Sequence, residues 1–160
     1  MAVQYIKQIN ERYSRLGYTP YRWFQADGQP AWAPLKKPIR QSKLGVLSTS
    51  GGYVVGQEAF HYKDDTSLRA IPKDTPDQDM RFSHITENYL VDPRQDPNCI
   101  IPLRALASLA ERGVVGGIAD DLFTCMGGIY SQRRVREELT PKLFKRWREQ
   151  EVDAVLLVAM

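Results

Sequence analysis

The sequence predicts an α/β fold, and three observations indicate it. Short apolar runs of strand length alternate along the chain with segments of helical periodicity. The chain has 160 residues and is 42% hydrophobic, which suffices for one buried core. Its last apolar run, Val152–Met160, is typical of a buried parallel strand. We therefore expect an open, mostly parallel sheet of the flavodoxin or Rossmann kind, with helices on both faces.

One α/β domain is expected over residues 1–160, with a helix and an arm in 1–42 and the core in 43–160. The helix is predicted because apolar side chains recur at helical spacing from Val3 to Leu16, and Gly17 follows as a cap. Residues 18–38 hold four prolines and several aromatic side chains, so we expect an extended arm packed over the domain. An aromatic lid or a subunit-contact surface is the alternative.

The first half of the core contains two predicted strands. Lys43–Ser48 is the first, and it leads into Thr49-Ser50-Gly51-Gly52, where glycine allows the backbone to approach a ligand closely. A ligand loop and a plain turn both remain open for this segment. Ser67–Ile71 is the second strand, which Pro72 ends. Residues 85–98 are rich in turn-forming side chains, and loops of that length are often functional.

Four further elements complete the predicted core. Pro102–Arg112 is a helix, with proline at its favoured first position. Leu122–Thr124 is a third strand, followed by a glycine turn. A charged helix covers residues 131–150, where Pro141 predicts a kink or a break into two helices. Asp153 opens the final strand.

Composition excludes several classes of protein. The net charge is +3, from 22 Lys and Arg against 19 Asp and Glu, and both signs are interspersed, so no nucleic-acid partner is expected. No apolar run approaches the roughly 20 residues of a membrane helix, and the start of the chain is too polar for a signal peptide. A cytoplasmic location without a membrane partner is the expectation. The two cysteines form no CxxC motif, so no metal site is predicted.

Two groups of polar side chains are candidates for chemistry. His84 follows a polar stretch, where an imidazole could act as a general base or bind a carboxylate or an amine; a structural role is the alternative. Asp65, Thr66 and Arg69 lie at the start of the second predicted strand. An inward-pointing Arg69 needs a carboxylate partner or an anionic ligand, and a structural pairing with Asp65 would satisfy it.

The cysteines differ in their expected surroundings. Cys99 precedes the helix at Pro102, and a helix N-terminus lowers the pKa of a thiol. Ile100 and Ile101 favour burial of Cys99 instead, and a buried cysteine is usually inert. Cys125 precedes a glycine turn and is expected to be the more exposed of the two thiols.

Five segments, in this order and spacing, resemble one known family over roughly residues 43–160. They are Asp65–Pro72, Ser83–His84, Asp96–Leu106, Met126–Gly128 and Val152–Leu157. The family is that of the glycine/sarcosine/betaine reductase and D-proline reductase selenoproteins. The resemblance implies reductive cleavage of a carbon–nitrogen bond in a small amino acid or its N-methyl derivative, by a selenol or thiol nucleophile. It also implies an oligomer or partner subunits, one of which carries a pyruvoyl group, and no cofactor in this chain.

The sequence departs from the family at its most reactive position. In the family the nucleophile directly follows the strand that matches Asp153–Val158, and this sequence ends at Met160. We expect a chain without the nucleophile and inactive alone, either because a UGA selenocysteine codon was read as a stop or because it is a half-length subunit. Cys125 also differs from the residue expected before Met-Gly-Gly.

The resemblance and the residue patterns together predict the site. Expected substrate-binding residues are Ser50, Asp65, Thr66, Arg69, His84, Asn98 and Gly127, with Arg69 or His84 contacting a substrate carboxylate. The catalytic candidates are His84, Cys99 and Cys125. Two alternatives stay open: an interaction subunit whose arm and last strand bind a partner chain, and a flavodoxin-like flavin binder that uses the loop Ser48–Gly52.

Overall fold

The computed structural model describes residues 3–20, 24–25, 27–29 and 33–160, which belong to two compact units, Met1–Ala33 and Pro34–Met160. The smaller unit contains the predicted first helix, α1 (Tyr5–Arg15), which ends before Gly17 with its positive φ of 81°. The arm residues Tyr21, Trp23 and Trp32 lie outside the described residues. That residues 1–160 form one domain stays a prediction.

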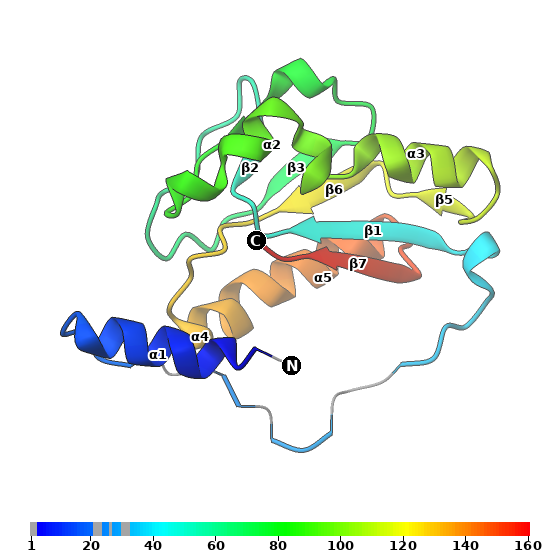
Figure 1. Ribbon diagram of the computed structural model, residues 1–160. Helices are drawn as coiled ribbons and strands as arrows, with labels where there is room; N and C mark the ends of the chain where they lie inside the picture. Colours follow the sequence, from blue (N-terminus) through cyan, green and yellow to red (C-terminus); the bar gives the residue numbers. More distant parts are fainter. Residues whose placement is uncertain (1–2, 21–23, 26, 30–32) are drawn as a thin grey trace. The chain divides into compact units, whose positions relative to one another are not determined.

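A five-stranded sheet forms the centre of the larger unit (Figure 1). β1 (Lys43–Ser48) pairs in parallel with β7 (Ala154–Val158), and also in parallel with β5 (Gly117–Ile118) and β6 (Asp121–Thr124). β3 (Arg69–Pro72) adds an antiparallel strand beside β6. The open, mostly parallel sheet that the sequence predicts is therefore confirmed.

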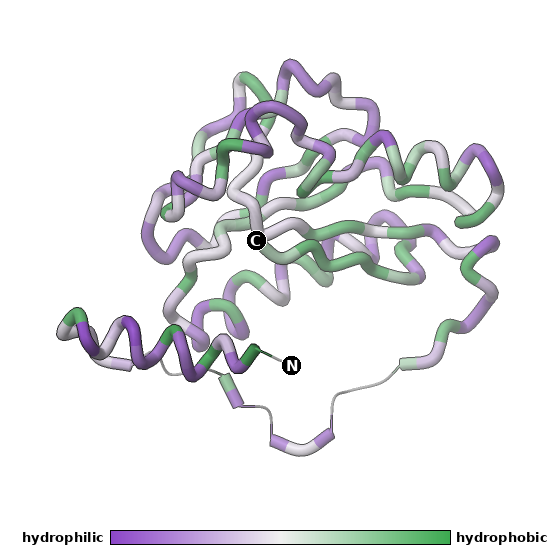
Figure 2. The backbone as a smooth tube through the Cα atoms, viewed as in Figure 1, coloured by the Kyte–Doolittle hydropathy of each residue, from purple (hydrophilic) through white to green (hydrophobic). Residues whose placement is uncertain are grey.

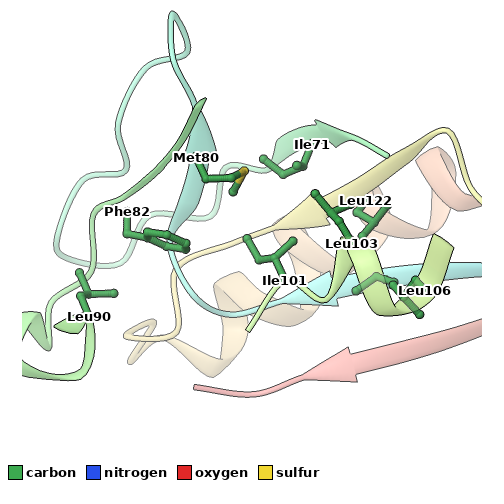
Figure 3. Packing of buried hydrophobic residues seen from close by; sticks show 9 residues of the cluster. Ile71, Met80, Phe82, Leu90, Ile101, Leu103, Leu106 and Leu122 are labelled. Atoms are coloured by element: carbon green, nitrogen blue, oxygen red, sulfur yellow. The ribbon is translucent and has the colours of Figure 1, made fainter. Parts of the chain in front are cut away.

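Helices cover both faces of this sheet, also as predicted. α3 (Leu103–Glu111) lies on one face, where Leu103 and Leu106 join the core with Leu122 of β6 (Figure 3). α5 (Thr140–Glu149) lies on the other face and packs Trp147 against Phe123 (Figure 1). β1 and β7 are strongly hydrophobic, whereas the outer helices and loops mix hydrophilic and hydrophobic residues (Figure 2). Burial of these apolar faces from water is what holds the layers together.

The predicted break near Pro141 takes the form of a π-helical turn. α4 (Gln132–Arg134) continues into the turn Val135–Leu139 and then into α5. Pro141 has no N–H to donate, and its ring crowds the preceding carbonyls, so the regular helical ladder is interrupted there. The hydroxyl of Thr140 donates to the carbonyl of Val135 at 2.9 Å and satisfies an acceptor that the interruption leaves.

Two features of the larger unit escape the sequence patterns. β2 (Gly52–Val54) pairs with β4 (Met80–Phe82) in a separate antiparallel ladder, and each strand is only three residues long. The predicted long loop at 85–98 contains α2 (Val91–Gln95). Short 3₁₀ turns complete the fold at Ile39–Gln41, Asp77–Asp79, Glu87–Tyr89 and Pro97–Cys99.

Candidate ligand site at the strand ends

The carboxyl ends of the three parallel strands β1, β6 and β7 are held together by hydrogen bonds. The N–H of Thr49, directly after β1, donates to the carbonyl of Val158 at 3.0 Å. The N–H of Met160 donates back to the hydroxyl of Thr49 at 2.9 Å. The N–H of Cys125, directly after β6, donates to the carbonyl of Ser48 at 3.0 Å. Ligands of open α/β proteins bind beyond such strand ends.

A close contact between two backbone segments brings the segment around Ser83 to the carboxyl ends of these strands. The N–H of Gly51 donates to Cys125 at 2.9 Å, and the N–H of Ser83 donates to the carbonyl of Gly51 at 3.0 Å. Gly51 has a φ of 65°, and a Cβ atom there would lie 2.1 Å from the carbonyl oxygen of Ser83. Glycine is therefore required at this crossing, which fixes the position of His84.

His84 presents one unpaired ring nitrogen at the strand ends. Its side chain is 6% exposed, and Nδ1 accepts a hydrogen bond from the N–H of Thr86 at 3.1 Å. Nε2 has no hydrogen-bond partner among the described residues. A buried polar atom without a partner is costly, which makes it a candidate for ligand binding.

The backbone of Gly127 lies close against that nitrogen. A Cβ atom at Gly127 would lie 2.7 Å from Nε2 of His84 and 2.8 Å from the carbonyl oxygen of Thr49. The hydroxyl of Ser48, which ends β1, is also buried and without a partner in the described part of the chain. We call Thr49, His84 and Gly127 the strand-end site. It can offer a ligand one hydrogen-bonding nitrogen in surroundings largely shielded from water.

The electrostatics of the strand-end site favour a neutral imidazole. Burial lowers the pKa of His84 below its ordinary value of 6.5, and the negative charge of Glu87 offsets this only in part. The ring is therefore uncharged at neutral pH.

Stability should consequently fall in mild acid. As the pH drops below 6.5, the unfolded chain takes up a proton before folded His84 does, so the free energy of unfolding decreases until the pH passes the folded-state pKa. Urea unfolding at several values between about pH 7.5 and 5.5 should show this decrease, and His84→Asn should reduce it. His61→Asn is the matched control, and an equal slope in wild type and His84→Asn would contradict the expectation.

Three of the predicted site residues lie in or beside the strand-end site. They are His84, Gly127 and Ser50, which forms an isolated bridge with Met126. Ser50 is fully buried, and its hydroxyl accepts a hydrogen bond from the N–H of Gly52 at 3.3 Å. Neighbouring Thr49 escapes the sequence prediction, although it belongs to the loop that the sequence singles out.

Arg69 lies opposite Thr124 at the carboxyl end of β6, and both Arg69 and Asp65 are held by contacts outside the strand-end site. Arg69 donates to the carbonyl of Glu58 at 2.7 Å and to the hydroxyl of Ser67 at 2.7 Å, and its guanidinium lies 4.3 Å from the ring centre of Phe60. Burial acts to raise the pKa of Asp65, but hydrogen bonds from Ser67 and His61 and the charge of Arg69 lower it overall. No ion pair joins Asp65 to Arg69 in the described part of the chain; Ser67 bridges them.

Thr66 belongs to a clamp that sequence reasoning missed. Its hydroxyl donates to Glu138 at 2.8 Å and accepts from Arg134 at 3.1 Å. The carboxylate of Asp64 accepts from the N–H groups of Tyr130 at 2.7 Å and Ser131 at 3.2 Å. The clamp therefore anchors the far end of the loop that carries Gly127.

Asn98 lies in a third cluster at the surface. Its amide nitrogen donates to the carboxylate of Asp77 at 3.0 Å, and its oxygen accepts from the N–H of Arg104 at 2.9 Å. Arg104 also pairs with Asp96 at 2.8 Å. These contacts already use both ends of the Asn98 amide, so its proposed substrate contact stays a prediction.

The sequence predicts Cys125 to be the more exposed of the two cysteines, and the structure shows the reverse. Cys125 is 2% exposed, and burial, followed by the charge of Asp65, raises its pKa to about 12. Cys99 is exposed and ends a 3₁₀ turn, whereas α3 begins only at Leu103, so no helix N-terminus acts on this thiol. Partial burial and the charges of Asp96 and Asp92 raise its pKa. Of the two alternatives for Cys99, the lowered pKa is therefore wrong, and so is burial, because the residue is exposed.

Thiol labelling should separate the two cysteines. Iodoacetamide at about pH 8 should modify Cys99 slowly and leave Cys125 untouched until urea unfolds the chain, because the thiolate is the reactive form. Cys99→Ser should abolish labelling of the folded chain, which mass spectrometry detects. Modification of Cys125 in the folded chain at the rate of Cys99 would contradict the structure.

A mostly parallel sheet with helices on both faces defines an α/β protein, and the unpaired histidine nitrogen makes its strand ends a candidate ligand site in the position usual for that class. No protein-family model matches the chain, and no solved structure matches it. The chain is similar to D-proline reductase subunit gamma of Acetoanaerobium sticklandii, with 31% identity over 130 residues, which are 81% of this chain and 53% of the relative. It therefore belongs to the proline/glycine reductase family.

The chain spans about half the length of the curated relative that it matches. No described helix has the length and apolar character required to cross a membrane. The described residues also contain no group of three or more His, Cys, Asp or Glu side chains that could hold a metal ion.

Proposed function

We propose that this chain supplies the substrate site for thiol- or selenol-dependent reductive cleavage of a carbon–nitrogen bond in a small amino acid or its N-methyl derivative. The observation that carries the proposal is the buried, unpaired Nε2 of His84 at the strand ends of a chain of this family. The relative is named for D-proline, so D-proline is the first compound to test.

The raised pKa values of both thiols in this chain argue that the nucleophile comes from another part of an assembly. Cys125 is buried with a pKa of about 12, and the pKa of Cys99 is raised as well, whereas a nucleophilic thiol needs a lowered pKa. In the proposed reaction an external thiolate or selenolate attacks carbon, and the amine leaves with the bonding electron pair and takes up a proton. A second thiol then releases the reduced product and leaves a disulfide or selenenyl sulfide. A partner subunit would carry the pyruvoyl group, and no residue of this chain is assigned to it.

Calorimetric titration of the whole chain with D-proline, glycine, sarcosine and betaine tests the substrate site. One of these compounds should bind, and His84→Asn should weaken its binding by about tenfold or more, because a buried hydrogen bond to a charged group contributes about 1.5–3 kcal/mol. His61→Asn is the control, because His61 is exposed and should leave the affinity unchanged. Equal affinity in wild type and His84→Asn would contradict the proposal.

An interaction role is a second candidate, and the exposure of β7 favours it. No described strand pairs with the edge of β7 that faces away from β1. Val155, Leu156 and Leu157 are 39%, 38% and 68% exposed, so the prediction that this parallel strand is buried on both faces is wrong. Exposed apolar strand edges commonly pair with another chain. Co-purification with the other subunits of a proline reductase should then be lost in Leu157→Lys; retention would contradict this role.

The loop Ser48–Gly52 offers little support for a flavin site. The N–H groups of Thr49 and Gly51 donate to backbone carbonyls of neighbouring segments, and that of Gly52 donates to the hydroxyl of Ser50. Backbone N–H groups that are already paired cannot cradle a phosphate. Visible absorbance of a bound flavin in the purified protein would reinstate this alternative.

A further inference from the structure

The contacts of Nδ1 define which nitrogen of His84 carries the proton. A backbone N–H can only donate a hydrogen bond, and the N–H of Thr86 points at Nδ1 from 3.1 Å. Nδ1 must therefore present its lone pair. The hydroxyl of Thr86 lies 2.6 Å from the same nitrogen and can also donate to it. A proton on Nδ1 would point at the hydrogen of the Thr86 N–H, and two donors cannot form a hydrogen bond with each other.

A neutral imidazole with a bare Nδ1 carries its proton on Nε2. Nε2 is the nitrogen that has no partner in the described part of the chain, and the backbone of Gly127 lies beside it. The site thus offers a ligand a hydrogen-bond donor rather than an acceptor. A general base needs the opposite arrangement, with a lone pair directed at the ligand.

We propose that His84 meets its ligand as a hydrogen-bond donor through Nε2–H, that Thr86 is the positioning residue that sets this tautomer, and that the ligand presents an acceptor oxygen. This inference rests on the proposed function and deepens it, because a small amino acid has such an oxygen in its carboxylate. The carboxylate, and not the amine, then faces His84. The amine is left free for the chemistry at the scissile carbon–nitrogen bond.

The tautomer is measured directly by long-range ¹H–¹⁵N correlation spectra of the whole chain with ¹⁵N-labelled histidine. The variant His61→Asn leaves a single histidine and makes the assignment unambiguous. At about pH 7.5 the spectrum should show a protonated Nε2 and a bare Nδ1. A proton on Nδ1, or on both nitrogens, would overturn the inference whatever the chain binds.

Variants of Thr86 test the positioning role separately. Thr86→Val removes the hydroxyl and keeps the backbone N–H, so the Nε2–H tautomer should persist. Thr86→Pro removes the N–H donor, and the ring should then sample both tautomers. Persistence of the Nε2–H tautomer alone in a folded Thr86→Pro variant would refute the role of Thr86. If that variant does not fold, the wild-type spectrum decides, because a proton on Nδ1 would show that the N–H of Thr86 does not set the tautomer.

Two probe ligands and two His84 variants test the nature of the bound group. D-proline should shift the Nε2–H proton signal, and pyrrolidine, which has the amine but no carboxylate, should not. His84→Gln places an amide N–H near the position of Nε2 and should bind D-proline within about threefold of wild type, whereas His84→Asn should lose about tenfold or more. A shift with pyrrolidine, or tighter binding by Asn than by Gln, would overturn the inference and leave the proposed function standing. An Nε2–H signal that stays unchanged with whichever of the four compounds binds would refute the carboxylate assignment, whereas the proposed function fails only if none of the four binds.

Discussion

Gly51→Ala should lower the free energy of unfolding by about 2–5 kcal/mol, the largest effect expected of any single substitution considered for this chain. Two costs combine at this position. Alanine resists the positive φ of 65°, and its Cβ would lie 2.1 Å from the carbonyl oxygen of Ser83, which is backbone and cannot rotate away. The loop crossing that positions His84 would have to open.

Urea unfolding of Gly51→Ala beside Gly56→Ala separates the two costs. Gly56 also has a positive φ, of 92°, but a Cβ atom there would meet nothing within 4 Å. Gly56→Ala should therefore lose only the conformational part, about 1–2 kcal/mol. Equal losses in the two variants would show that the crossing of Gly51 and Ser83 is not as close as the structure has it.

Gly127→Ala should abolish ligand binding at the strand-end site, with a loss of about tenfold or more, and destabilise the fold by about 1–3 kcal/mol. The added Cβ would lie 2.7 Å from Nε2 of His84 and 2.8 Å from the carbonyl oxygen of Thr49. The methyl group would therefore crowd Nε2 of His84, the nitrogen proposed to bind the ligand. It would also displace either the imidazole or the loop after β1.

Gly117→Ala is the matched control for this variant, because a Cβ atom at Gly117 would meet nothing within 4 Å. Neither glycine has a positive φ, so the two substitutions differ in space and not in backbone strain. Calorimetry should find wild-type affinity in Gly117→Ala and none or weak binding in Gly127→Ala. Wild-type affinity in Gly127→Ala would place the ligand somewhere else.

Much of the fold was open to prediction because its central strands are apolar runs of ordinary strand length. β1 and β7 each carry such a run, and the helix around Leu106 has a clear apolar face between proline and glycine signals. The ladder of β2 and β4 left no such signal, since each strand has three residues and Arg81 interrupts the second. Pairing between such short strands depends on tertiary packing more than on local pattern.

The site was harder to predict, because its defining feature is the absence of a hydrogen-bond partner for Nε2 of His84. His84 and Gly127 were both expected, yet no pattern could show that Nδ1 is bonded to Thr86 while Nε2 is left unpaired. The burial of Cys125 follows from its place at the end of β6, where the loop after β1 covers it. A glycine turn in the sequence gives no sign of that cover.

The central claim is that the strand-end site of Thr49, His84 and Gly127 binds the carboxylate of a small amino acid. The most direct test is a map of backbone amide shifts in the ¹⁵N-labelled chain during titration with D-proline. The largest shifts are expected at Thr49, His84 and Gly127. Saturating shifts centred instead on Arg69 and Asp65, with the strand-end site unchanged, would contradict the claim.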